Sequence, residues 1–262
     1  MSVFDLDQKS MNRIPVVESP NKCSTCVLGK FCLPVGLSPE DADHVDSIIT
    51  ERIRIKKGET LYRQNDVLNA VFGVRVGSLK TQIVFPDGRE QVTGFHLPGE
   101  ILGLGGIGEQ RHHANAVALE DSEVCVIHMT QLEDLSRQLP SLQHQFHRIM
   151  SQEINQYRQH LLSLGSMRAE ERLANFLLNL SSRFAARGYS STEFNLRMSR
   201  EEIGSYLGMQ IETVSRLLSR FTEGGLIQIK LRNVKLVDIA GLAQVAGHSS
   251  VADASHYHCE HH

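Results

Sequence analysis

The segment "MSREEIGSYLGMQIETVSRLLSRF", residues 198 to 221, constrains the fold more than any other part of this 262-residue chain. Ser199 followed three residues later by Glu202 forms a capping box, which predicts a helix that begins there and ends near Leu207. Gly208 then supplies a turn, and a second helix directs four apolar residues inward: Val214, Leu217, Leu218 and Phe221. Two short helices joined at a glycine turn predict a helix-turn-helix.

The second helix of this motif presents polar side chains on its opposite face, near its N-terminal end. Glu212, Ser215 and Arg216 lie where such helices contact base edges in the major groove of DNA. An arginine donates to both acceptors of guanine, and a glutamate accepts from the cytosine amino group. Glu212 and Arg216 are also spaced i,i+4, so a surface ion pair is the alternative interpretation. Further candidate contacts to double-stranded DNA are Ser199, Arg200, Gln210, Thr213 and Arg220.

A basic hairpin follows the motif. The segment "LIQIKLRNVKLVDI" predicts two strands around Arg232-Asn233, which form a small wing. Lys230, Arg232 and Lys235 are candidate phosphate contacts, and a solvated hairpin is an equally good alternative. Residues 167 to 245 hold 11 Lys and Arg against 8 Asp and Glu, although the whole chain has a formal net charge of −3. This balance weakly favours the C-terminal part as the nucleic-acid surface.

The chain before the motif shows two different periodicities. Between Ile53 and Ile127, short strand-like runs such as "VFGVRVG" alternate with glycine and proline turns, which predicts an antiparallel barrel or roll. After Pro140 the apolar residues step by four and three and predict a narrow seam on a long helix. The seam consists of Met150, Ile154, Tyr157, Leu161 and Leu164. Such a seam favours a homodimer that pairs two copies of the helix, and packing on the chain's own roll is the alternative.

These patterns predict an α+β fold: an N-terminal antiparallel β-roll of the cyclic-nucleotide-binding type, a long dimerisation helix and a C-terminal winged helix-turn-helix. The predicted parts are a cysteine-rich arm (1–35), a β-roll sensor domain (36–139), a dimerisation helix (140–166), a winged helix-turn-helix (167–245) and a disordered His-rich tail (246–262). The sequence shows neither an apolar run of about 18 residues nor a signal-peptide core, so a cytoplasmic protein without membrane contact is expected. It also lacks a Ser-His-Asp arrangement, an HExxH motif and a phosphate-binding glycine loop, so an enzyme is not expected.

Three of the five cysteines lie in "CSTCVLGKFC", residues 23 to 32. In a reducing compartment, clustered thiols indicate metal binding or redox chemistry before disulfides. A thiol oxidoreductase is disfavoured, because its motif belongs at a strand-to-helix junction, whereas these cysteines precede a roll and lie among prolines. Cys259 lies in the terminal run "HYHCEHH", where metal affinity would be incidental to a disordered tail.

A β-roll, a long helix and a winged helix-turn-helix resemble, over nearly the whole chain, the cyclic-AMP receptor and fumarate-nitrate regulator (CRP/FNR) superfamily. The segments "CSTCVLGKFC", "GFHLPGEILG", "ALEDSEVC" and "SREEIGSYLGMQIETVSRLLSRF" resemble its oxygen-sensing FNR branch. The resemblance implies a [4Fe-4S] cluster held by Cys23, Cys26, Cys32 and Cys125, and four thiolates are the usual ligands of such a cluster. A zinc site or free thiols for the first three, and a buried core position for Cys125, are the alternatives. Cys125 is expected at the end of a roll strand.

The resemblance also implies the output of the sensor. A cluster-bound dimer binds a two-fold symmetric, TTGAT-type DNA site and regulates anaerobic genes, and oxygen destroys the cluster and lowers the DNA affinity. The turn "FPDGRE", residues 85 to 90, lies where family members contact RNA polymerase, and an ordinary turn is the alternative. Its candidate contacts are Phe85, Asp87, Gly88 and Arg89.

A rival hypothesis and one departure from the FNR pattern bear on the mechanism. A CRP-like regulator that responds to a small-molecule effector without a cluster is the rival hypothesis. A cyclic nucleotide is disfavoured as that effector, since Gly99-Glu100 is followed by "RHHANAVA", which lacks the Arg-Ser-Ala or Arg-Thr-Ala run that would hold its phosphate. On the long helix, Tyr157 stands where FNR-type sensors usually carry an acidic residue. A buried tyrosine ring favours pairing where a carboxylate opposes it, so the dimer is predicted to depend less on the cluster.

Overall fold

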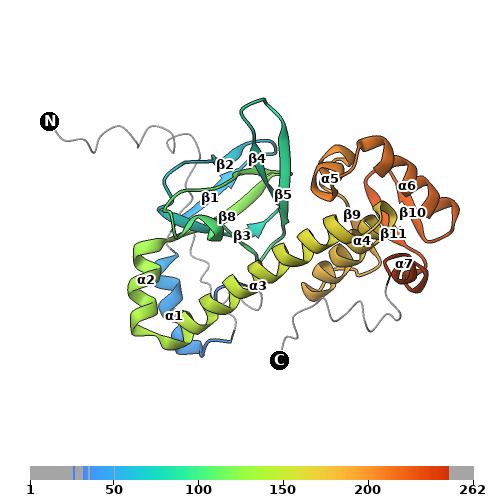
Figure 1. Cartoon of the computed structure of the whole chain (residues 1–262). Coiled ribbons are helices and arrows are strands. Elements are labelled where there is room, and N and C mark those ends of the chain that lie inside the picture. Colours follow the sequence, from blue (N-terminus) through green and yellow to red (C-terminus); the bar gives the residue numbers. More distant parts are fainter. Residues whose placement is uncertain (1–25, 27–31, 35, 50, 248–262) are drawn as a thin grey trace. The chain divides into compact units, whose positions relative to one another are not determined.

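The computed structural model describes Cys26 and residues 32–34, 36–49 and 51–247 (Figure 1). The chain divides into two compact units: residues 1–89 and 93–147 form the first, and residues 90–92 and 148–262 form the second. Cys23, Cys259 and almost all of the predicted tail lie outside the described residues. Within the described part of the chain, no helix has both the length and the apolar character to cross a membrane.

The first unit is built on two four-stranded sheets, in the orders β1-β8-β3-β6 and β2-β7-β4-β5. Neighbouring strands pair antiparallel, for example β8 with both β1 and β3. The strands are β1 (Glu51–Ile55), β2 (Thr60–Tyr62), β3 (Ala70–Val76), β4 (Leu79–Val84), β5 (Glu90–His96), β6 (Ile101–Leu102), β7 (Asn115–Ala118) and β8 (Ser122–His128), with the 3-10 turn η2 (Leu104–Gly106) after β6. The predicted antiparallel roll is therefore confirmed.

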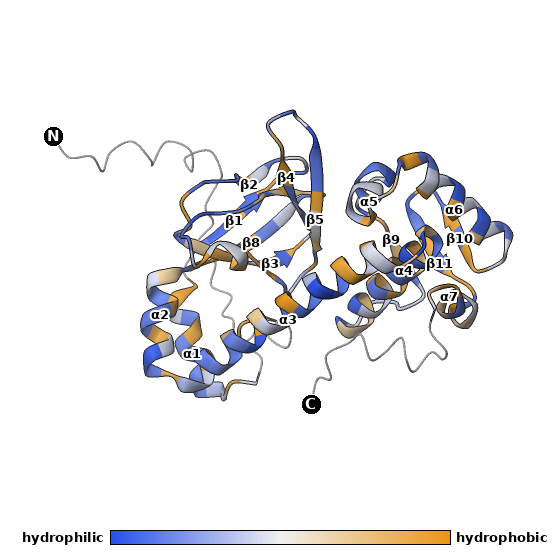
Figure 2. Cartoon of the chain, viewed as in Figure 1, coloured by the Kyte–Doolittle hydropathy of each residue, from blue (hydrophilic) through white to orange (hydrophobic). Residues whose placement is uncertain are grey.

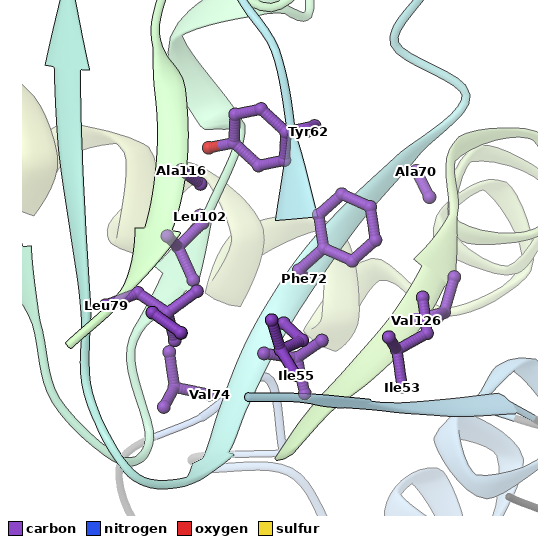
Figure 3. Packing of buried hydrophobic residues seen from close by; sticks show 12 residues of the cluster. Ile53, Ile55, Tyr62, Ala70, Phe72, Val74, Leu79, Leu102, Ala116 and Val126 are labelled. Carbon is purple, nitrogen blue, oxygen red and sulfur yellow. The ribbon is translucent and has the colours of Figure 1, made fainter. Parts of the chain in front are cut away.

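The core of the roll follows from the two-residue period of its strands. Ile53 and Ile55 of β1 pack with Phe72 and Val74 of β3 and with inward residues of the other strands (Figure 3). Because successive side chains of a strand point to opposite faces, the residues between these positions lie on the outer face of the sheet. That outer face carries the candidate cysteine site described below.

Two helices belong to the first unit, and a third continues from it into the second unit. Helix α1 (Pro39–Ile48) begins where Ser38 Oγ accepts a hydrogen bond from the Asp41 amide at 3.1 Å, with Pro39 in the first turn. Helix α2 (Met129–Gln138) follows β8, and α3 (Pro140–Ser166) begins at a proline two residues later. Hydrophilic and hydrophobic residues alternate along α3 (Figure 2), as expected for a helix with a narrow apolar seam. The predicted long helix is confirmed, whereas α1 and α2 were not predicted.

The second unit contains the helix-turn-helix and its wing. Its helices after α3 are α4 (Ala169–Ala186), α5 (Arg200–Leu207), α6 (Ile211–Glu223) and α7 (Ile239–Val245). Strands β9 (Glu193–Asn195), β10 (Ile227–Lys230) and β11 (Asn233–Leu236) form a sheet in the order β10-β11-β9. The wing thus has a third strand that the sequence did not predict. Its tip is Leu231-Arg232, one residue earlier than expected, because Asn233 already pairs with Lys230 in the ladder.

Candidate functional site

Local chemistry fixes the geometry of the helix-turn-helix. Ser199 Oγ accepts from the Glu202 amide at 3.1 Å, and the Ser199 amide donates to Glu202 Oε2 at 2.6 Å, so the predicted capping box is present. Gly208 ends α5 in the left-handed region with φ of 63°, a conformation that glycine adopts at low cost. Gly204 allows the close approach of the turn, because a Cβ there would lie 2.5 Å from the carbonyl oxygen of Met209.

Helix α6 buries one face and exposes the other. Its buried residues are Val214, Leu217, Leu218 and Phe221, the four predicted to point inward. Glu212 and Arg216 are exposed, and neither takes part in an ion pair within the part of the chain that the structure describes. Ser215 is half-buried and accepts a hydrogen bond from Arg200 Nη1 at 3.1 Å. The guanidinium and carboxylate are therefore available to base edges, while the serine hydroxyl already has an internal donor.

The other candidate DNA contacts differ in how free their side chains are. Ser199 is committed to the cap of α5, and Arg220 Nη2 pairs with Glu170 Oε2 at 3.0 Å. Gln210 is exposed and Thr213 is half-buried. In the wing, Lys230, Arg232 and Lys235 are all exposed, and Arg232 donates to the carbonyl oxygen of Arg197 at 2.8 Å. The wing that follows α6 thus exposes three positively charged side chains.

Cys125 occupies the centre of β8, not the strand end that the sequence predicted. Its partner in β1 is Arg52 and its partner in β3 is Gly73. Directly paired residues of antiparallel strands point to the same face, and here that is the outer face. Gly73 leaves room for the arm, since a Cβ at this position would lie 3.3 Å from the sulfur of Cys32. The fold therefore brings Cys32 to Cys125, 93 positions apart in sequence.

The thiols at this place influence one another. Burial raises the pKa of Cys32 to about 12, a backbone hydrogen bond from Leu33 opposes the rise, and the nearby thiols of Cys125 and Cys26 add to it. Burial also raises the pKa of Cys125, while the Arg52 guanidinium, which donates a hydrogen bond to this sulfur, opposes that rise. Cys26, Cys32 and Cys125 are all free thiols. Three of the four candidate ligands are thus close enough to interact electrostatically.

The donor set that the described residues provide consists of cysteine sulfurs. Among the described residues, no group of three His, Cys, Asp or Glu side chains is placed to hold an ion. Cys23, the remaining candidate ligand, lies outside the described residues. A cluster of several iron atoms does not require its ligands to converge on one point, and its usual donors are cysteine thiolates. The sulfur-only composition and the space over Gly73 therefore fit such a group.

Sequence reasoning missed Arg52. The segment "ERIRI" shows strand alternation, which places Arg52 and Arg54 on the same outward face and predicts exposure for both. Arg52 is nevertheless only 6% exposed. Its position beside Cys125 follows from the pairing of β1 with β8, which no local pattern in the sequence reveals.

The seam of α3 is open in the single chain. Ile154, Tyr157 and Leu161 are 64%, 41% and 68% exposed, and Met150 and Leu164 are half-buried. The Tyr157 hydroxyl lies beside Glu153; partial burial raises the pKa of Tyr157, and the Glu153 carboxylate raises it further. Three of the five seam side chains are thus exposed in the single chain.

The β4–β5 hairpin holds the turn at residues 85 to 88 in a defined shape. The Gly88 amide donates to the Phe85 carbonyl at 2.9 Å, and Gly88 has φ of 84°. Arg89 pairs with Asp87 at 2.7 Å and also lies 5.4 Å over the Phe85 ring. The hydrogen bonds from Arg89 lower the pKa of Asp87. The four candidate residues therefore form one exposed, preorganised tip.

Comparison with known proteins bears on both units. Residues 52–138 match the model of the cyclic nucleotide-binding domain, and residues 171–245 match that of the Crp-like helix-turn-helix domain. The transcriptional regulatory protein btr of Bordetella pertussis is 56% identical over 91% of this chain and 98% of its own length. The fumarate and nitrate reduction regulatory protein of Escherichia coli is 42% identical over 87% of this chain and 91% of its own length. The chain belongs to the CRP/FNR family of transcription regulators.

A solved structure of this family has the same fold. FixK2 from Bradyrhizobium japonicum superimposes with a TM-score of 0.67 at 28% identity, covering 74% of this chain and 96% of FixK2. The relatives in the family are named as transcription regulators, in agreement with the expectation that this CRP/FNR protein is not an enzyme. Its helix-turn-helix makes it a DNA-binding protein.

Proposed function

We propose that this CRP/FNR protein regulates anaerobic gene expression and senses oxygen through a [4Fe-4S] cluster held by Cys23, Cys26, Cys32 and Cys125. The observation that carries the proposal is the position of the Cys32 sulfur over Gly73, beside Cys125 on the outer face of the roll. When bound, the cluster supplies a redox centre that reacts with oxygen. The cysteines from the arm and the one from β8 then tie the arm to the sensor domain.

The same proposal assigns the output to α3 and α6. Two copies of the chain pair along the seam of Met150, Ile154, Tyr157, Leu161 and Leu164, because this pairing covers the apolar side chains that are exposed in the single chain. Pairing presents two α6 helices to the half-sites of a two-fold, TTGAT-type sequence. In each half-site Glu212 and Arg216 contact base edges, assisted by Ser215.

The exposed hairpin tip provides the proposed contact with RNA polymerase. Phe85 and Arg89 are already held together by the stacking of the guanidinium on the ring, so little side-chain freedom is lost on docking. Repression through occlusion of a promoter would require only the DNA contacts. The proposal therefore includes activation and repression by one dimer.

The first arm of the test concerns the cluster. Protein purified without oxygen is expected to be coloured and to contain about four iron atoms per chain, as a [4Fe-4S] cluster requires. Replacement of Cys23, Cys26, Cys32 or Cys125 by serine, one at a time, should remove the iron, while Cys259→Ser serves as the matched control and should retain it. A colourless, iron-free anaerobic protein would contradict the proposal. If that protein still bound a specific DNA site, the effector-dependent alternative would replace it.

The second arm concerns the DNA. Arg216→Ala is expected to weaken binding to a TTGAT-type site by roughly ten-fold or more, the effect of losing one bidentate base contact. Glu223→Gln, at the other end of α6, is the control and should leave affinity unchanged. Fluorescence anisotropy at fixed salt measures both. If the wild type binds TTGAT-type and scrambled sites with equal affinity, and Arg216→Ala does the same, α6 does not read this sequence.

A further inference from the structure

Arg52 is an unusual residue for the outer face of a sheet, because its guanidinium is almost completely buried. Only 7% of its side chain is exposed, whereas 63% of the side chain of Arg54 is exposed, two positions along the same strand. Burial of a charged group is costly unless neighbouring groups compensate it. Arg52 therefore needs partners whose interactions offset the free-energy cost of burying its guanidinium.

One partner is the carboxylate of Glu123, which three arginines share. Arg75 Nη1 lies 2.6 Å from Glu123 Oε1, and Arg54 Nε lies 3.2 Å from Glu123 Oε2. Arg52 Nη1 is the most distant, at 4.0 Å from Oε1. The carboxylate thus makes its close hydrogen bonds to the other two arginines. Three guanidinium groups face one carboxylate here, so the region is positively charged.

The second partner is Cys125. The two residues are directly paired across β1 and β8, and the Arg52 side chain donates a hydrogen bond to the sulfur. On the other side of Cys125 lies Gly73, above which the Cys32 sulfur is placed. Cys125 therefore has an open side that receives the arm and a closed side occupied by a buried cation.

We propose that Arg52 is a positioning residue for the cluster: it fixes the Cys125 sulfur through its hydrogen bond and compensates negative charge of the thiolate ligands. The inference rests on the proposed function. Four thiolates bring more negative charge than the iron–sulfur core neutralises, and hydrogen bonds and charges near the sulfurs set the reduction potential of such clusters. A bound cluster exposed to air would lose one electron to dioxygen, which would become superoxide. A cation beside Cys125 would oppose the loss of that electron, so Arg52 is expected to slow the response to oxygen.

The test compares Arg52→Gln with Arg54→Gln, a matched control that removes the same charge from the same strand and the same Glu123 cluster. Each protein is purified without oxygen, and its iron content, the midpoint potential of its cluster and the rate at which the cluster absorbance decays in air are measured. We expect Arg52→Gln to have a lower potential and roughly ten-fold faster decay, the effect of one charge-assisted hydrogen bond. Arg52→Lys should recover part of both changes, and Arg54→Gln should change both much less, because the exposed guanidinium of Arg54 is screened by water.

Glu123→Gln provides a second variant in case Arg52→Gln does not fold, as judged by thermal melting. Removal of this carboxylate leaves the three arginines uncompensated, so the potential should rise and the decay should slow, opposite in sign to Arg52→Gln. Loss of packing alone would not produce opposite signs.

Two results would overturn the inference while leaving the proposed function intact: an Arg52→Gln protein with the potential and decay rate of Arg54→Gln, or a Glu123→Gln protein whose potential is unchanged or lower. A wild-type protein without a cluster would instead overturn the proposed function and this inference together.

Discussion

His112 shows how one residue inside the roll couples its protonation to folding. Its ring stacks on Tyr62 with the centroids 3.7 Å apart, and its Nδ1 has no hydrogen-bond partner among the described residues. Burial lowers the pKa of His112 to about 4; the Asp66 carboxylate opposes this shift and His113 reinforces it slightly. The folded protein therefore holds this imidazole neutral at pH values where an unfolded chain would protonate it.

We predict that His112 makes the first unit less stable in mild acid. The unfolded state takes up a proton below about pH 6.5 and the folded state only below about pH 4, so the free energy of unfolding falls between these values, by about 3 kcal/mol at most. His112→Phe keeps a stacked ring that cannot take up a proton, so the free energy of unfolding should depend less on pH. Urea unfolding from pH 7.5 to pH 4.5 measures it. The control is His113→Gln, an exposed neighbour, which should keep the wild-type slope; an unaltered slope in His112→Phe would disprove the assignment.

At the scale of elements, two glycines on helices differ in the space that surrounds them. A Cβ at Gly204 of α5 would meet the Met209 carbonyl at 2.5 Å, a backbone atom that cannot move without opening the turn. A Cβ at Gly165 of α3 would meet no atom within 4 Å. The same substitution therefore has opposite consequences in the two helices.

We predict that Gly204→Ala destabilises the second unit by about 1–3 kcal/mol, the usual cost of overpacking, and weakens DNA binding because α6 is displaced relative to α5. Gly165→Ala, the matched control, should be neutral or stabilise α3 by up to about 1 kcal/mol through helix propensity. Thermal melting and DNA titration of both variants measure these effects. A Gly204→Ala protein with wild-type melting and affinity would mean that the turn has room that the structure does not show.

The same elements show what the sequence predicts and why. The bounds of α5 depend on Ser199, Glu202 and Gly208, which act within one or two helical turns, so local chemistry was sufficient to predict them. Strands β7 and β9 are four and three residues long, and they are held by pairing: β7 with β2 and β4, and β9 with β11. Their partners are distant in sequence, and no local pattern specified them.

The cysteine site was likewise predictable from the sequence only in part. The types and spacing of the cysteines indicated thiolate chemistry, but the meeting of Cys32, Gly73 and Cys125 depends on the register of β8 with β3 and on the position of Cys32 over Gly73. Arg52 lies beside Cys125 because β1 pairs with β8 in this register. Sequence reasoning therefore singled out the cysteines and missed the residue beside them.

At the scale of the whole molecule, the seam of α3 is the surface along which we propose that two chains pair and present their α6 helices together. Tyr157 lies in the middle of this seam and is 41% exposed, while Leu162 is 60% exposed on the same helix but outside the four-and-three stepping of the seam. An aspartate at the first position would place a charge between the paired helices, whereas one at the second would remain in solvent.

We predict that the iron-free protein remains dimeric in air because the Tyr157 ring is buried against its counterpart without charge repulsion. Tyr157→Asp should convert this iron-free form to monomer, because each paired carboxylate would lose its water while facing a like charge. Sedimentation velocity at micromolar concentration, with and without oxygen, measures the change, and Leu162→Asp should stay dimeric in both conditions. If the wild-type protein without iron sediments only as a monomer, Tyr157 is not sufficient for dimerisation in the absence of the cluster. The arm with its cysteines must then supply the missing stabilisation.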